Sequence, residues 1–269
     1  MSHDRGCPCG RERYDYSSCE ESDCMKKTTQ TPSNTKKFET LVTVMRAQPF
    51  HNGHKAIIDA ALEQANEGIV VLGSSFQARE ATRNPFSFEE RKAIISAVYP
   101  EEVASGELKI VGVMDYPYDD NAWVSAVQHT VNNAISHKPW KDYPLKTGLI
   151  GHSKDHTSYY LKIFPDWSKN SIEVPNIAGI DATDIRHMMF DTLKDPRLYI
   201  HAIKAAMPAK AYAAMSDIIL SNGNIGGVWE QLVKEYGLTM EYREKSQMKG
   251  FNFPSSFVTT DAVLTQSGY

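Results

Sequence analysis

The stretch "TLVTVMRAQPFHNGHKAIIDAALEQAN", residues 40–66, joins a β-branched apolar run to a segment whose apolar residues recur at helical spacing. Residues 40–47 have the composition of a buried strand, and the segment after Gly53 has the pattern of an amphipathic helix. Two histidines, His51 and His54, lie on either side of Gly53, between the predicted strand and the predicted helix. The sequence therefore predicts a strand, a short turn that carries both imidazoles, and a helix.

The same alternation recurs further along the chain. Apolar runs predict strands at 68–75, 108–113 and 146–151, with a helix opened by the capping box at 87–90 and another that includes Val127. Strands that alternate with helices at this interval imply an α/β fold with a Rossmann-like parallel sheet. In such a sheet, ligands bind beyond the carboxyl ends of the strands.

Length and composition set the class of protein. The chain has 269 residues, of which 41% are hydrophobic, which is enough for the core of a globular domain. The formal net charge is −4 with both signs mixed, which argues against a nucleic-acid partner. No apolar run approaches the roughly 18 residues that span a bilayer, and the N-terminus lacks the pattern of a signal peptide. We therefore expect a cytoplasmic protein that binds neither nucleic acid nor membrane.

The N-terminal segment differs in composition from the rest of the chain. Residues 1–38 are rich in polar and charged side chains and contain all the cysteines of the chain, Cys7, Cys9, Cys19 and Cys24. The spacing of these cysteines lacks the paired C-x2-C pattern of common zinc sites. We expect a disordered tail rather than a metal site.

The turn that carries the histidines falls at the carboxyl end of the first predicted strand. Gly53 lets the backbone come close to a ligand, and the free amide N–H groups of a helix N-terminus attract an anion. Phosphate is therefore the expected ligand of His51 and His54. The alternative is a pair of surface histidines that only cap the helix.

Longer stretches narrow the assignment. They are "RNPFSFEER" (83–91), "NAWVSAV" (121–127), "GHSKDHTSYYLKIFPDW" (151–167) and "IDATDIR" (180–186). With the H-x-G-H motif, these stretches resemble nicotinamide mononucleotide (NMN) adenylyltransferases of the H-x-G-H nucleotidyltransferase superfamily. The resemblance is to the adenylyltransferase half of the bifunctional enzymes fused to a Nudix hydrolase, and it covers about residues 40–190. It implies a Rossmann-like parallel sheet of the H-x-G-H type with a C-terminal helical segment.

The resemblance implies transfer of AMP from ATP to NMN, with release of pyrophosphate and with Mg²⁺ accompanying the ATP. The attacking and leaving oxygens are already charged at neutral pH, so the reaction needs positioning and charge neutralisation rather than a general base. By resemblance, His51 and His54 contact the ATP phosphates, and His54 is the better candidate for the group that develops charge in the transition state. Arg46, Arg91 and Arg186 are candidate phosphate clamps, because a guanidinium can donate to two oxygens at once.

Further binding residues follow from the same motifs. The resemblance implies ATP contacts from Gln48, Gly53, Lys154, Asp155 and Thr183, and NMN contacts from Asn84, Asn121 and Trp123, with Trp123 stacked on the pyridine ring. No residue is expected as a protein ligand to a metal. Taken alone, Thr183 also fits an ordinary helix N-cap, and Trp123 also fits the buried stripe of its helix.

Three positions depart from the family pattern. Met45 and Ala47 stand where the family commonly has glycine and phenylalanine, and Asp181 stands where it usually has serine. Met45 replaces a residue that allows close approach of a ligand. A carboxylate at position 181 would repel phosphate or recruit magnesium.

The sequence predicts several regions in order. They are a disordered tail (1–38), a nucleotidyltransferase domain (39–192), a helical cap (193–240), a charged linker (241–250) and a truncated start of a Nudix-like domain (251–269). The last region contains "FVTTDAV" (257–263), which resembles the opening strand of the Nudix domain, but the sequence has no Nudix box of metal-binding glutamates. Pairing with a separate Nudix polypeptide and assembly as a homo-oligomer are both open.

Two other functions are compatible with the sequence. A sister enzyme that transfers a nucleotidyl group to another acceptor, such as pantetheine phosphate or an alcohol phosphate, would share the H-x-G-H and arginine motifs. It would not be expected to have "NAWVSAV" or the 151–167 stretch. A nucleotide-binding sensor without turnover would keep the fold, and the departures at Met45, Ala47 and Asp181 are compatible with it.

Overall fold

The computed structural model describes residues 36–135, 147–152, 160–175, 181–195, 197–221 and 227–248. Its centre is a five-stranded sheet, in which every pair of neighbouring strands is parallel. The strands are β1 (Phe38–Met45), β2 (Ala65–Leu72), β3 (Leu108–Gly112), β4 (Thr147–His152) and β5 (Ile172–Val174), in the order β3-β2-β1-β4-β5. The predicted Rossmann-like parallel sheet is confirmed.

The order of the strands places a reversal of direction beside β1. The chain proceeds from β1 through β2 to β3 on one side, and then returns to form β4 on the other side of β1. In open α/β sheets, the crevice for ligands forms outside the carboxyl ends of the strands at this reversal. The turn after β1, which contains both histidines, therefore lies at the expected binding edge.

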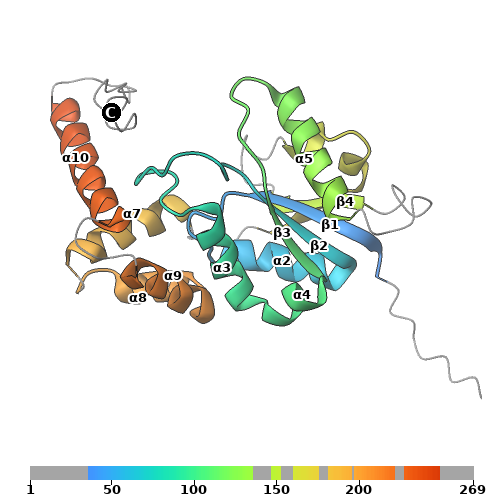
Figure 1. Cartoon of the computed structure of the whole chain (residues 1–269), viewed down its shortest axis with the longest axis horizontal. Coiled ribbons are helices and arrows are strands. Elements are labelled where there is room, and N and C mark those ends of the chain that lie inside the picture. The colour runs from blue at the N-terminus through green and yellow to red at the C-terminus, as the bar shows by residue number, and fades with distance from the viewer. Residues whose placement is uncertain are drawn as a thin grey trace, which may run out of the picture. The chain divides into compact units, whose positions relative to one another are not determined.

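Helices cover both faces of the sheet (Figure 1). Helices α2 (Asn52–Gln64), α3 (Phe88–Val98) and α4 (Pro100–Ser105) lie on one side, and α5 (Asp120–Ala134) lies on the other. The short helices α6 (Tyr160–Ile163) and η3 (Trp167–Asn170) follow β4.

The strands supply side chains to both faces because neighbouring residues in a strand point in opposite directions. On β1, Val42 packs in the cluster of α5, whereas Leu41 packs with Ile57 of α2. Both strand residues are fully buried, as expected for a parallel sheet covered on its two sides.

The C-terminal helices pack against the same side of the sheet as α3. They are α7 (Ala182–Lys194), α8 (Ile200–Ala206), α9 (Ala209–Ser221) and α10 (Val228–Met248). Helix α9 contacts α3, and Trp229 and Tyr236 of α10 belong to the same apolar cluster as Ile94 and Ile95 of α3. These helices are therefore continuous with the core of the sheet domain.

Two regional boundaries differ from the expectation. Residues 241–248 form the end of α10, where the charged composition predicted a linker. Lys245 and Glu241, four residues apart on this helix, form an ion pair of 2.5 Å, so charged side chains are compatible with a solvated helix. β1 already begins at Phe38, within the predicted tail. Residues 1–35 and the predicted Nudix-like start at 251–269 lie outside the described residues.

Glu235 on α10 generates a prediction about pH and stability. Its carboxylate accepts a hydrogen bond from the Ala81 N–H at 3.2 Å, and burial, with the nearby charge of Glu80, raises its pKa above the ordinary 4.5. A raised pKa in the folded state means that stability is lost as the pH rises from 4.5 through the folded value. Glu235→Gln keeps an oxygen acceptor but cannot ionise. In thermal unfolding, the Tm of Glu235→Gln minus the Tm of the wild type should therefore increase as the pH is raised from acidic to neutral. A difference in Tm that does not change with pH would contradict the assignment.

Candidate active site

The two histidines of the H-x-G-H motif cap the N-terminus of α2. Nδ1 of His51 accepts the Gly53 N–H at 3.0 Å, and Nδ1 of His54 accepts the His51 N–H at 3.3 Å. The two rings lie 3.8 Å apart, centre to centre. Because a ring nitrogen that accepts a hydrogen bond carries no proton, the proton of each neutral ring is at Nε2. The cap therefore fixes the tautomer of both imidazoles.

Gly53 is required by the packing of this turn. A Cβ atom at this position would lie 2.9 Å from Cε1 of His51, closer than side-chain carbons approach one another. The amide N–H groups of the first turn and the positive end of the helix dipole add to the attraction for an anion. Both histidines therefore cap α2, as the alternative interpretation of the sequence expected.

Arg91, a predicted phosphate clamp, is fully buried. Its Nη1 donates to the carbonyls of Arg46 at 2.6 Å and Gly73 at 2.8 Å, and its Nη2 donates to the Ser74 carbonyl at 3.3 Å. Nε donates to the Ser87 carbonyl at 3.3 Å. Burial lowers the pKa of Arg91 to about 10, a value at which the group is still charged at neutral pH. The guanidinium joins the ends of β1 and β2 to the start of α3.

Gln48 also makes an internal contact instead of facing a ligand. Its side-chain Nε2 donates to the Phe86 carbonyl at 2.8 Å, and its Oε1 accepts the Phe86 N–H at 3.0 Å. The side-chain amide of Gln48 therefore makes the same pair of hydrogen bonds to the Phe86 backbone that a residue of a neighbouring strand would make. The Gln48 side chain, which the resemblance assigns to ATP, is thus paired with the backbone of Phe86 in the described structure.

Arg186 connects three parts of the chain near the same edge. Nη1 donates to the Gln48 carbonyl at 2.5 Å, Nε donates to the Thr82 carbonyl at 3.1 Å, and Nη2 donates to Oγ1 of Thr183 at 3.1 Å. A guanidinium has five N–H groups, so two of them have no partner among the described residues. Burial, together with the positive charges of Arg46 and Arg83, lowers the pKa of Arg186 to about 10.

The N-cap of α7 is Asp181, where the sequence had suggested Thr183. One oxygen of Asp181 accepts the Thr183 N–H at 2.6 Å, and the extended backbone of Asp181 is typical of an N-cap residue. A carboxylate is a strong acceptor for an amide at a helix N-terminus, so the acidic residue takes this role. Thr183 is exposed and accepts from Arg186 instead.

Arg46 is an exposed arginine at this edge. It directly follows β1, and its side chain has no hydrogen-bond or ion-pair partner within the part of the chain that is described. Met45 and Ala47 on either side of it are buried in the apolar core, which separates the Met45 side chain from any bound phosphate. Ala47 has a φ of 49°, a left-handed conformation that favours glycine.

The residues expected to bind NMN are only partly brought together. Trp123 is half-buried and packs edge-on against Phe164 at 5.5 Å, so it contributes to the core as the alternative reading allowed. Asn121 is exposed in the first turn of α5. Asn84 is buried, and its Oδ1 has no hydrogen-bond partner among the described residues. Lys154 and Asp155, expected to bind ATP, lie outside the described residues.

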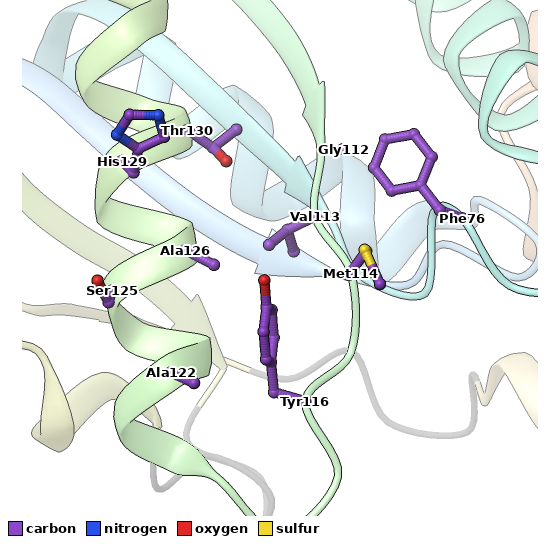
Figure 2. Close-up of a pocket in the computed structure, with 10 residues that line it drawn as sticks. All are labelled: Phe76, Gly112, Val113, Met114, Tyr116, Ala122, Ser125, Ala126, His129 and Thr130. Atoms are coloured by element: carbon purple, nitrogen blue, oxygen red, sulfur yellow. The ribbon is translucent and has the colours of Figure 1, made fainter.

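A pocket of about 540 Å³ lies beside this edge, between β3 and α5. Figure 2 shows α5 on one side of it, the segment after β3 on the other, and the Tyr116 ring between them. Trp123 is not among the residues that line it. The lining residues are Phe76, Gly112, Val113, Met114, Tyr116, Ala122, Ser125, Ala126, His129 and Thr130.

Asp115 is a functional candidate that the sequence reasoning missed. Its carboxylate accepts from the Ser74 N–H at 3.0 Å, the Ser74 hydroxyl at 2.6 Å and Nε2 of Gln77 at 3.0 Å. It therefore fixes Ser74, whose φ is 51°, beside the end of β2. Its place soon after β3, at the carboxyl edge, was the signal that could have identified it.

The described residues offer no ready-made cage for a metal ion. No group of three or more His, Cys, Asp or Glu side chains is clustered in the described ranges. Mg²⁺ is commonly held by substrate phosphates and water with only one or two carboxylates.

No helix of the described part is long and apolar enough to cross a membrane.

Comparison with known proteins gives the family. The model of cytidylyltransferase-like domains matches residues 43–188, which is more than half of the chain. The chain belongs to the cytidylyltransferase-like family. The matched range contains the H-x-G-H turn and extends to α7, so it covers the edge described above.

Two relatives within the family are adenylyltransferases. The nicotinamide/nicotinic acid mononucleotide adenylyltransferase of Acinetobacter baylyi is 40% identical over 155 residues, which are 58% of this chain and 77% of that protein. The nicotinamide-nucleotide adenylyltransferase of Ignicoccus hospitalis is 36% identical over 138 residues, which are 51% of this chain and 76% of that protein. The resemblance that the motifs indicated is confirmed.

A solved structure gives the same fold. The bifunctional NMN adenylyltransferase/ADP ribose pyrophosphatase of Francisella tularensis aligns with a TM-score of 0.60 and 26% identity over 82% of this chain. The aligned part is 59% of the Francisella chain, so this chain spans about three fifths of its length. A second structure of that protein, with AMP and a manganese ion, aligns at 24% identity and shows the fold alone.

The contrast between Arg91 and Arg46 generates a second prediction. Arg91→Lys keeps the charge but cannot reach the carbonyls of Arg46, Gly73 and Ser74 together, so it should lower the free energy of unfolding by about 2 kcal/mol or more. Arg46→Lys is the matched control, because an exposed change should alter stability by less than about 0.5 kcal/mol. Urea denaturation measures both. Equal unfolding midpoints for Arg91→Lys and the wild type would show that the guanidinium does not hold the strand ends.

Proposed function

We propose that this chain is a nicotinamide-nucleotide adenylyltransferase, which transfers AMP from ATP to NMN to form NAD⁺ and pyrophosphate. The observation that carries the proposal is the cap of α2, in which two imidazoles of fixed tautomer stand at the switch point of the parallel sheet. The adenylyltransferase relatives from Acinetobacter and Ignicoccus support this choice of reaction.

The reaction is an in-line displacement at the α-phosphorus without a covalent intermediate. The phosphate oxygen of the acceptor attacks, the bond to the bridging oxygen breaks, and pyrophosphate leaves. Catalysis then depends on positioning the two substrates and stabilising negative charge as it moves to the leaving group. Donors that are oriented before the substrate arrives serve this purpose best, because they need no reorganisation during the reaction.

The imidazoles are such donors. With Nδ1 of each ring held by the cap, Nε2–H is the group that His51 and His54 can offer to the triphosphate. The exposed guanidinium of Arg46 and the two remaining N–H groups of Arg186 supply further positive charge at the same edge. In this proposal, Arg91 and Gln48 position the backbone and do not touch the substrate.

The remaining predicted contacts complete the proposal. Lys154, Asp155 and Thr183 are assigned to ATP, and Asn84, Asn121 and Trp123 to NMN. The unpartnered Oδ1 of buried Asn84 is an available acceptor for an amide N–H. Mg²⁺ would bind through the ATP phosphates and neutralise their charge, with no protein cage required. A cytoplasmic location, a homo-oligomer and pairing with a Nudix polypeptide remain predictions.

A coupled pyrophosphate assay tests the reaction. The full chain is incubated with ATP, Mg²⁺ and one acceptor at a time, namely NMN, nicotinic acid mononucleotide or phosphopantetheine. We expect pyrophosphate release with NMN and appearance of NAD⁺. Release with phosphopantetheine alone would identify a sister transferase instead. ATP binding with no release for any acceptor would identify a nucleotide sensor.

Substitution of His54 tests the catalytic role of the imidazole pair. His54→Ala should lower kcat by a factor on the order of 10² or more, with little change in ATP affinity, if the ring acts mainly on the transition state. Lys55→Ala is the control on the same turn, because its ammonium pairs with Asp59 at 2.5 Å and should not affect turnover. Kinetics and calorimetric ATP binding are measured on both variants. Equal losses in kcat and in ATP affinity would assign His54 to ground-state binding.

A further inference from the structure

His152, the last residue of β4, lies in the 151–167 stretch but is not among the predicted site residues, and it makes two contacts beside the H-x-G-H turn. Its Nδ1 lies 2.8 Å from the Val174 carbonyl at the end of β5, and its Nε2 lies 3.1 Å from the Gly53 carbonyl in the first turn of α2. A single half-buried ring therefore joins three elements, β4, β5 and α2.

The contact with α2 is made at the glycine of the H-x-G-H motif. A Cβ atom on Gly53 would lie 2.9 Å from Cε1 of His51 and 3.7 Å from Nε2 of His152, so the glycine lies between the two rings. The same glycine donates its N–H to Nδ1 of His51. His152 thus contacts the carbonyl of the residue whose N–H orients the His51 imidazole.

The contacts of His152 with the two carbonyls require that the ring donates the hydrogen bond. Val174 and Gly53 each present a carbonyl oxygen to the His152 ring, and a carbonyl oxygen only accepts hydrogen bonds. A neutral imidazole carries one N–H and donates to one of them, whereas a protonated ring donates to both. The Gly53 carbonyl has a second lone pair, so it can accept from His152 without giving up its place in the helix.

We infer that His152 is a positioning residue for the H-x-G-H turn. It fixes Gly53 against the ends of β4 and β5, and so sets the distance of His51 and His54 from the reacting phosphate. The inference rests on the proposed adenylyl transfer for its effect on turnover. Its structural part, the orientation of the two imidazoles, does not depend on which reaction is catalysed.

The role differs from that of a residue that only stabilises the fold. Displacing a catalytic group by about 1 Å can lower the rate on the order of 10²-fold even when the protein remains folded. Loss of His152 should therefore reduce kcat in protein that is still folded and still binds ATP. A purely structural residue would reduce the folded fraction and leave the kcat of the folded molecules unchanged.

The test uses two substitutions of His152 in the full chain. His152→Leu removes the ring nitrogens that face the two carbonyls, and we expect kcat to fall about 10-fold or more while the ATP dissociation constant changes less than about 3-fold. His152→Gln retains an N–H donor and should restore part of the lost kcat. His201→Leu is the matched control, because His201 is an exposed imidazole on α8 outside the pocket lining, and its removal should leave kcat unchanged. Unchanged kcat in folded His152→Leu would overturn the inference, as would a loss that only matches the loss of folded protein.

A spectroscopic measurement separates this inference from the proposed function. If wild-type protein releases no pyrophosphate with any acceptor, the proposed function fails. The position of His152 is then tested by ¹⁵N–¹H spectra of the histidine rings, with the His51 and His54 signals assigned by substitution. His152→Leu should shift both signals in the folded protein. Signals that coincide with those of the wild type would overturn the positioning role whatever the enzyme catalyses.

Discussion

The buried guanidinium of Arg91 is the contact on which the geometry of the site depends. The carboxyl ends of parallel strands leave backbone carbonyls without partners inside the sheet, and a buried carbonyl without a donor is costly. Arg91 supplies donors to the carbonyls of Arg46, Gly73 and Ser74 from within the core. The ends of β1 and β2 are thereby fixed relative to each other, and the turn after β1 starts from a defined position.

The site follows from that fixed edge by a series of local hydrogen bonds. Gln48 pairs with the backbone of Phe86, and Arg186 donates to the Gln48 carbonyl, so the turn is held from both sides. The caps made by His51 and His54 then orient their rings. In this arrangement the buried polar groups organise the backbone, and the proposal assigns imidazole and guanidinium N–H donors to the nucleotide. A site that offers hydrogen-bond donors and positive charge, without a general base, suits a reaction in which the substrates themselves carry the nucleophile and the leaving group.

Much of this could be predicted from the sequence because periodicity and strand–helix alternation report burial directly. The parallel sheet, the place of the histidines at its carboxyl edge and the family all followed from short motifs. The roles of Arg91 and Gln48 could not be predicted, since residue type shows what a side chain can donate but not which backbone it faces. The same limit explains the N-cap of α7, where Asp181 and Thr183 are both capable of capping. The charged end of α10 was taken for a linker because composition alone does not distinguish a solvated helix from an irregular segment.

The central claim is that His51 and His54 present Nε2–H groups to the phosphates of a bound nucleotide. A crystal structure of the full chain with NMN and a non-hydrolysable ATP analogue tests this most directly. The account predicts that Nε2 of both rings lies within hydrogen-bond distance of phosphate oxygens, about 2.7–3.2 Å, while both Nδ1 atoms keep their backbone donors. A triphosphate bound away from the α2 N-terminus, or rings turned so that Nδ1 faces the phosphates, would contradict it.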